Sequence, residues 1–186
     1  EPQELRKAKY YNSELIKLVE DLSQLVDWNR LGKVKINRMQ DAEFVSELVF
    51  FLLEREPMDA SKKENIDDYY KKWSEALDVE KSLQVKEAFT ATINYLSSLE
   101  IDFEKYKING VSHFYALFVL SFQCINAKSD PVVVSAKVNE FFDCLRTADK
   151  LSDDVKEYRE SMQASTRSKS QRVRRIRALS HYCGIQ

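Results

Sequence analysis

One stretch in the middle of the chain, residues 110–125, constrains the fold more than any other. It reads Gly-Val-Ser-His-Phe-Tyr-Ala-Leu-Phe-Val-Leu-Ser-Phe-Gln-Cys-Ile, and its large side chains are almost all apolar. A helix built from it would be apolar nearly all round and would need neighbours on every face. At about 15 residues it is too short to cross a bilayer, which takes roughly 20. The stretch therefore predicts the central helix of a soluble helical bundle.

Glycine and proline are scarce, with three of each among 186 residues. Tight hairpins and phosphate-cradling loops need glycine, so this scarcity favours long helices joined by short connections. Apolar and aromatic residues also recur at helical spacing, as in Ile66, Tyr69, Tyr70, Trp73 and Leu77. These patterns predict an all-α fold, a multi-helix bundle of about seven to eight helices around the apolar central helix.

Four polar residues mark expected helix starts. Asp41 is expected to cap the helix that carries the apolar run 44–53, and Ser112 is expected to cap the central helix. Asp130, which precedes a proline, and Ser152 open two later helices in the same way. Each of these side chains has an oxygen that can accept a hydrogen bond from the first turn of a helix.

The residue types that most often carry chemistry are few and scattered. Cys124, Cys144 and Cys183 lie in apolar patterns without CxxC spacing, which is typical of buried free thiols in a reducing cytosol. His113 is expected to be a structural histidine bonded to a carbonyl, and His181 to lie at the surface. No HExxH, GxSxG, P-loop or DxDxDG pattern occurs. We therefore expect no catalytic residue, no metal site and no cofactor in this chain, and a cytoplasmic location.

Charge is distributed unevenly along the chain. The formal net charge is -1, yet every acidic residue lies at or before Glu160. Residues 1–164 hold 23 Lys and Arg against 30 Asp and Glu, a net charge of -7, whereas residues 165–186 carry a net charge of +6. We divide the chain accordingly into a helical bundle, residues 1–164, and a basic C-terminal helix, residues 165–186, packed on the same domain.

The basic segment is the candidate site for an anionic partner. Its six cations are Arg167, Lys169, Arg172, Arg174, Arg175 and Arg177. Arginine forks match phosphate oxygens, and the serine and threonine hydroxyls before the helix lie where a helix N-terminus stabilises phosphate. A cluster of this size predicts salt-dependent nucleic-acid binding. In the alternative interpretation, these arginines pair with the acidic helices at residues 149–160, and the segment is docked on its own domain.

The last helix is expected to be amphipathic. Helical spacing groups its apolar residues on one face, with the arginines around the rest. The residues expected on this apolar face are Val173, Ile176, Leu179 and Cys183.

Three short segments of the chain resemble a known family. The first is residues 1–11, Glu-Pro-Gln-Glu-Leu-Arg-Lys-Ala-Lys-Tyr-Tyr, and the second is residues 36–48, where Arg-Met is followed by Asp41 and Glu43. The third is Ser-His-Phe-Tyr-Ala-Leu at residues 112–117. In this order and spacing they resemble the helical region that follows the ParB-like domain in domain-of-unknown-function family 262, whose members include the GmrSD-type modification-dependent restriction enzymes. The resemblance covers most of the chain.

The resemblance implies a non-catalytic part of a DNA-directed defence protein. The family's ParB-like domain carries a DGQQR-type motif for nucleotide and phosphodiester chemistry, and neither this motif nor an HNH-type nuclease motif occurs here. We therefore expect a fragment or excised domain that supports the missing nucleotide-hydrolysing domain and helps to bind DNA through residues 167–177. Its expected partners are DNA and that N-terminal domain, without membrane contact.

Two alternatives belong to other classes of protein. The chain can be a protein-interaction or oligomerisation module, including a homo-oligomer, with no direct nucleic-acid contact. A self-contained enzyme is the third alternative.

Overall fold

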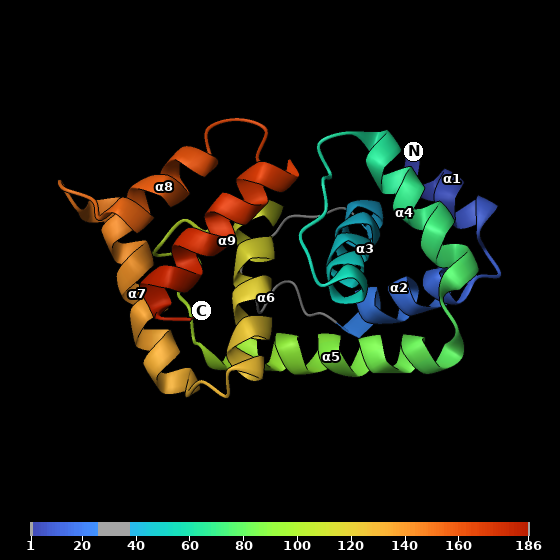
Figure 1. Ribbon diagram of the computed structural model, residues 1–186, viewed down its shortest axis with the longest axis horizontal. Coiled ribbons are helices and arrows are strands. Elements are labelled where there is room, and N and C mark those ends of the chain that lie inside the picture. The colour runs from blue at the N-terminus through green and yellow to red at the C-terminus, as the bar shows by residue number, and fades with distance from the viewer. Residues whose placement is uncertain (1, 26–37, 186) are drawn as a thin grey trace. The chain divides into compact units, whose positions relative to one another are not determined.

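The computed structural model describes the backbone of residues 2–25 and 38–185, and this part of the chain contains nine helices and no strand (Figure 1). They are α1 (Pro2–Lys9), α2 (Glu14–Leu25), α3 (Arg38–Glu54), α4 (Lys63–Ala76), α5 (Val79–Ser98), α6 (Val111–Asn126), α7 (Pro131–Thr147), α8 (Asp153–Ser161) and α9 (Lys169–Cys183). The all-α prediction is confirmed. The predicted number of seven to eight helices is too low for the described part of the chain.

The helices group into two compact units, and the boundary between them falls inside α5. Helices α1 to α4 and the part of α5 up to Thr90 form the first unit. The rest of α5, from Ala91, and helices α6 to α9 form the second unit. The basic segment thus belongs to the same unit as α6, α7 and α8. The domain boundary between residues 164 and 165 stays a prediction.

In the first unit, α2 and α3 supply most of the core. Helix α3 packs against α1 and α2. The apolar run 44–53 lies in α3, and its residues from Phe44 to Leu52 are buried, including Ser46 and Glu47. Because neighbouring segments enclose α3, side chains on every face of the helix are buried over this run. The run is therefore a buried helix, as the sequence predicts.

Two of the four predicted helix starts are correct. The side chain of Asp130 accepts a hydrogen bond from the amide of Val132 and caps α7, whose first residue is a proline. The side chain of Ser152 accepts from the amide of Val155 and caps α8. Both caps are local features, and each satisfies one amide that the helix leaves without an internal partner.

The other two predicted starts are wrong. Helix α3 begins at Arg38, so Asp41 lies inside the helix and does not cap it. Helix α6 begins at Val111, and its cap position is Gly110, which makes no side-chain hydrogen bond. Gly110 has φ 84°, a left-handed conformation that favours glycine, and the chain has already turned there before it reaches Ser112.

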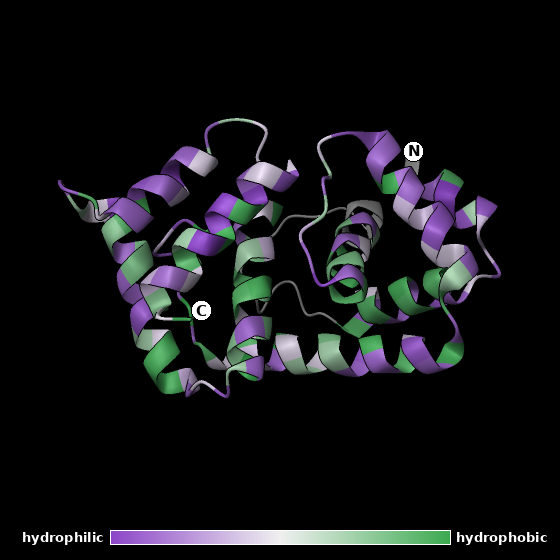
Figure 2. Ribbon diagram, in the orientation of Figure 1, coloured by the Kyte–Doolittle hydropathy of each residue, from purple (hydrophilic) through white to green (hydrophobic). Residues whose placement is uncertain are grey.

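In the second unit, α6 is buried along most of its length. The side chains of Leu117, Phe118 and Leu120 are fully enclosed. Helix α9 packs along α6 and also contacts α7 and α8. Figure 2 shows α6 as a largely hydrophobic helix, while hydrophobic and hydrophilic residues alternate along α9. None of the described helices is both long and apolar enough to cross a membrane.

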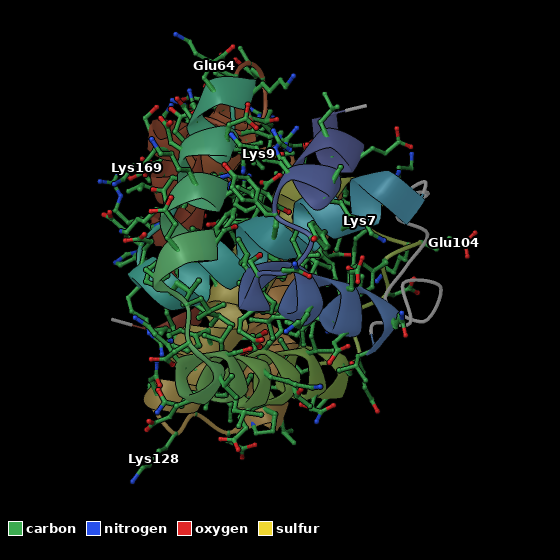
Figure 3. The ribbon with its side chains drawn as sticks, turned by 90° about the vertical axis from the view of Figure 1, so that its right-hand side faces the viewer. Lys7, Lys9, Glu64, Glu104, Lys128 and Lys169 are labelled. Atoms are coloured by element: carbon green, nitrogen blue, oxygen red, sulfur yellow. The ribbon has the colours of Figure 1, made fainter. Side chains whose placement is uncertain are left out.

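The end of α6 contains a conformation that suits glycine but is occupied by lysine. Lys128 has φ 53°, and the amides of Lys128 and Ser129 donate to the carbonyls of Ile125 and Cys124 to close the helix end. A residue with a Cβ atom loses about 1 kcal/mol in this region of backbone space. The side chain of Lys128 is exposed and points away from the protein (Figure 3). We predict that Lys128→Gly raises the free energy of unfolding, measured in urea, by about 0.5–1 kcal/mol.

The same change in a helix interior is the matched control. Lys156 is exposed within α8, where glycine is a poor helix former. Lys156→Gly should lower the free energy of unfolding by about 1 kcal/mol. Equal losses in the two variants would contradict the interpretation of Lys128.

Candidate nucleic-acid interface

Helix α9 carries five of the six predicted DNA-binding residues. The helix begins because Ser168 accepts a hydrogen bond from the amide of Gln171, and it ends at Gly184, whose φ of 74° reverses the chain. Three of the four residues predicted on its apolar face, Ile176, Leu179 and Cys183, are buried, whereas Val173 is exposed. Arg172, Arg175, Ala178 and Ser180 complete the buried face. Two arginines thus take the place expected for an apolar residue.

Arg175 is fully buried and binds backbone carbonyls from three segments. Its Nη2 donates to the carbonyl oxygens of Ser161, at 2.9 Å, and Thr166, at 3.1 Å, and its Nη1 donates to that of Ser112, at 3.4 Å. These carbonyls lie at the end of α8, in the loop before α9 and at the start of α6. Burial lowers the pKa of Arg175. The guanidinium group is therefore committed to the fold and cannot reach an external phosphate.

Arg172 is buried against an aromatic ring. Only 2% of the residue is exposed, and its guanidinium carbon lies 3.9 Å from the ring centre of Tyr115 in α6. A desolvated cation over an aromatic face contributes about 2 kcal/mol. Arg172 and Arg175 therefore belong to the core of the second unit. Neither is placed where DNA could contact it.

Arg174 and Arg177 lie on the outer side of α9 and face acidic residues of α8. Arg174 pairs with Glu160 at 3.3 Å and with Glu157 at 3.5 Å, and Arg177 pairs with Glu157. Their side chains are 38% and 67% exposed. For these two residues the structure shows the pairing with residues 149–160 that the alternative interpretation proposes.

A hydrogen bond between His181 and Asp154 continues this row of contacts. His181 is exposed, as predicted, and its Nδ1 lies 2.8 Å from a carboxylate oxygen of Asp154. We call the whole row the charge seam. Its members are Asp154, Glu157 and Glu160 of α8 and Arg174, Arg177 and His181 of α9.

The remaining two predicted residues lie at the start of α9. Arg167 is partly exposed in the loop before the helix, and Lys169 is exposed in its first turn. Figure 3 shows the side chain of Lys169 pointing away from the protein. Lys169, Arg174 and Arg177 form what we call the outer edge of α9. Four of the six predicted residues therefore lie at the surface: Arg167 and the three residues of the outer edge.

The signal that separates the two kinds of arginine was present in the sequence. Arg172, Ile176 and Leu179 follow one another at intervals of four and three residues, and Arg175 is three residues after Arg172. This is the spacing of one helical face. Because arginine is rarely buried, a face with two arginines does not count as a core stripe. The spacing alone does not show that these arginines are buried, because their partners Ser112 and Tyr115 come from a distant part of the sequence.

His113 forms a buried polar contact of the second unit. Its Nδ1 lies 2.8 Å from the hydroxyl oxygen of Tyr158 in α8, so its partner is a phenol and not the carbonyl that we predicted. The two rings are stacked with centres 5.7 Å apart. Burial, with smaller contributions from the charges of Arg146 and Arg175, lowers the pKa of His113 from 6.5 to about 4. His113 is therefore neutral in the folded protein near pH 7.

The first unit contains a buried arginine that the sequence does not identify. Arg6 of α1 is only 4% exposed and pairs with Asp67, at 2.6 Å, and Glu43, at 2.8 Å. Beside it, Gln3 donates a hydrogen bond of 2.7 Å to the hydroxyl of Tyr70. Burial alone would lower the pKa of Arg6, but the two carboxylates raise it. The ion pair with Glu43 joins the first two segments on which the family resemblance rests.

This arrangement gives α1 an inverted polarity. Gln3 and Arg6 point into the first unit and are buried, whereas Leu5 is 67% exposed. Tyr11, in the turn that follows, is exposed to the same extent. Charged partners in α3 and α4 hold the helix in this orientation, so its apolar residues face outward.

Comparisons with known proteins do not assign the chain. No protein-family model matches it, and neither a curated protein nor a solved structure is significantly similar to it. Among the described residues, no three His, Cys, Asp or Glu side chains are grouped so that they could hold a metal ion. The three cysteines are free thiols, with Cys124 and Cys183 buried and Cys144 partly exposed.

We predict that His113 makes the protein less stable at mildly acidic pH. Between pH 6.5 and about 4 the unfolded chain binds a proton that the folded chain excludes, so stability falls as the pH is lowered through this window. His113→Gln should remove about 2–3 kcal/mol of this pH dependence. Urea unfolding of the wild type and the variant at several pH values gives the difference.

Proton NMR provides an independent check on the same residue. The chain has two histidines, so the variant assigns both ring signals. The signal lost in His113→Gln should titrate near pH 4 in the wild type. A signal that titrates near the ordinary value of 6.5 would contradict the buried, neutral state of His113.

Proposed function

We propose that this chain is the helical, non-catalytic region of a GmrSD-like, DNA-directed defence protein. In this proposal the helical units support a nucleotide-hydrolysing, ParB-like domain, and α6 is the central helix around which the second unit packs. The resemblance of residues 1–11, 36–48 and 112–117 to family 262 supports the proposal. The ion pair between Arg6 and Glu43 adds a physical reason for the first two segments to occur together.

We also propose that the outer edge of α9 contributes to DNA binding. One observation carries this part of the proposal: two buried arginines and the apolar residues beside them fix α9 in place, and the helix presents Lys169, Arg174 and Arg177 at the surface. No acidic residue occurs in α9 or after it. Cations on a fixed helix lose less conformational freedom on binding than cations on a mobile tail.

The number of available cations limits the strength of this interaction. With Arg167, at most four of the predicted residues can reach phosphates, instead of six. Each phosphate contact contributes about 0.9 to the slope of log affinity against log salt, so the expected slope is no steeper than about -4. Contacts of this kind position a protein on DNA and read no sequence. The segment is therefore proposed as an accessory contact in a larger DNA-binding protein.

The exposed apolar residues of α1 favour the alternative of a protein-interaction module. Leu5 and Tyr11 are both 67% exposed, and buried polar contacts hold α1 in that orientation. A surface of this kind would contact another domain or subunit through apolar side chains. Such binding depends little on salt, unlike phosphate contacts, so the two functions can be told apart.

We predict that neutralising exposed cations of α9 weakens DNA binding. Fluorescence anisotropy with a labelled duplex of about 20 base pairs at low salt measures the affinity. Lys169→Gln with Arg177→Gln should lower the affinity about tenfold and reduce the magnitude of the salt slope by about 2. Arg172 and Arg175 are left unchanged because both are buried, so substituting them would change the stability of the fold as well as the charge.

The matched control removes two positive charges from another part of the second unit. Lys128 and Lys150 are both exposed. Lys128→Gln with Lys150→Gln changes the net charge equally and should alter the affinity less than about twofold. Equal effects of the two double variants, or no binding of the wild type at low salt, would refute a DNA contact on α9.

A further inference from the structure

The charge seam places carboxylates where a DNA phosphate would otherwise bind. Glu157 lies against both Arg174 and Arg177, and Glu160 lies against Arg174. In the proposed function, these are two of the three cations on the outer edge of α9. An incoming phosphate must therefore compete with carboxylates that already accept hydrogen bonds from the same guanidinium groups.

The position of Glu160 runs against the local preference of α8. The helix runs from Asp153 to Ser161, so Glu160 lies in its last turn, whereas Glu157 lies at its middle. Negative charge is unfavourable at the C-terminal end of a helix dipole, whereas Asp153 and Asp154 in the first turn are favourable. Residues that break a local rule often do so for a compensating interaction, and for Glu160 the compensation comes from Arg174.

We propose that Glu157 and Glu160 make α8 an autoinhibitory edge that limits DNA binding by α9. This inference rests on the proposed DNA contact of α9. The carboxylates occupy Arg174 and Arg177 in the free protein, and DNA phosphates displace them. Exposed ion pairs are weak, and arginine binds phosphate bidentately with release of counterions from the DNA, so the exchange of partners is feasible.

The exchange requires no movement of α9. Arg172, Arg175, Ile176 and Leu179 stay buried, and only the two exposed guanidinium groups change partners. The carboxylates of Glu157 and Glu160 are 25% and 44% exposed, so an approaching phosphate can reach the groups that they bind. The effect on DNA affinity is therefore separable from the stability of the core.

The test compares two double variants that change the net charge by the same amount. Glu157→Gln with Glu160→Gln removes the carboxylates of the seam. Asp149→Asn with Asp153→Asn removes two exposed carboxylates from the same region, neither of them in the seam. Anisotropy with the labelled duplex should show about tenfold tighter binding for the first pair and less than about threefold for the second.

A further set of variants shows whether the gain acts through the arginines. Adding Arg174→Gln and Arg177→Gln to the variant without the seam carboxylates should abolish the gain. Equal affinities of the two acid-neutralised proteins, or a gain that survives without the arginines, would overturn the autoinhibition. Circular dichroism and urea unfolding check that each protein is folded. If the double variant without Glu157 and Glu160 does not fold, the single variant Glu160→Gln replaces it in the binding assay.

The outcome also separates this inference from the proposed function. If the wild type binds DNA and the seam variant binds equally, the DNA contact stands and the autoinhibition fails. If the wild type does not bind at low salt, both fail.

Discussion

The arrangement of the second unit depends on one buried cation. Arg175 has no exposed surface and donates hydrogen bonds to carbonyl oxygens from the start of α6, the end of α8 and the loop before α9. A cation in a protein interior costs several kcal/mol unless hydrogen bonds compensate for the lost water. The three carbonyls supply this compensation only if the three segments meet at one point. Arg175 therefore fixes where α9 lies and which of its residues face outward.

Neighbouring arginines on α9 consequently have opposite roles. Successive residues of a helix point about 100° apart, so Arg174 faces α8 and solvent while Arg175 faces the core. Arg172, on the inner face, lies over the ring of Tyr115. The six cations look uniform in the sequence but fall into three groups. Arg172 and Arg175 are buried, Arg174 and Arg177 pair with carboxylates of α8, and Arg167 and Lys169 lie at the start of α9. A functional account that counts all six cations together overstates the positive surface.

The sequence predicts features that depend on local or averaged properties. Glycine scarcity and apolar periodicity predict the all-α fold and the buried helix at 44–53, and Asp130 caps α7 as expected from its own short segment. The predictions are wrong where a distant partner determines whether a side chain is buried, or where a backbone turn determines where a helix begins. Arg175 depends on a carbonyl 63 residues away, and Arg6 depends on Glu43, 37 residues away. The predicted cap at Ser112 fails because Gly110 already turns the chain.

A comparison of Arg175→Met with Arg177→Met in urea unfolding tests whether the buried and the exposed arginines of α9 have different roles. Both changes replace the same charged side chain with an apolar one of similar length. Arg175→Met leaves carbonyl groups without donors and should lower the free energy of unfolding by about 3 kcal/mol or more. Arg177→Met removes one exposed ion pair and should cost less than about 1 kcal/mol. Equal losses would contradict a structural role of Arg175 that Arg177 does not share.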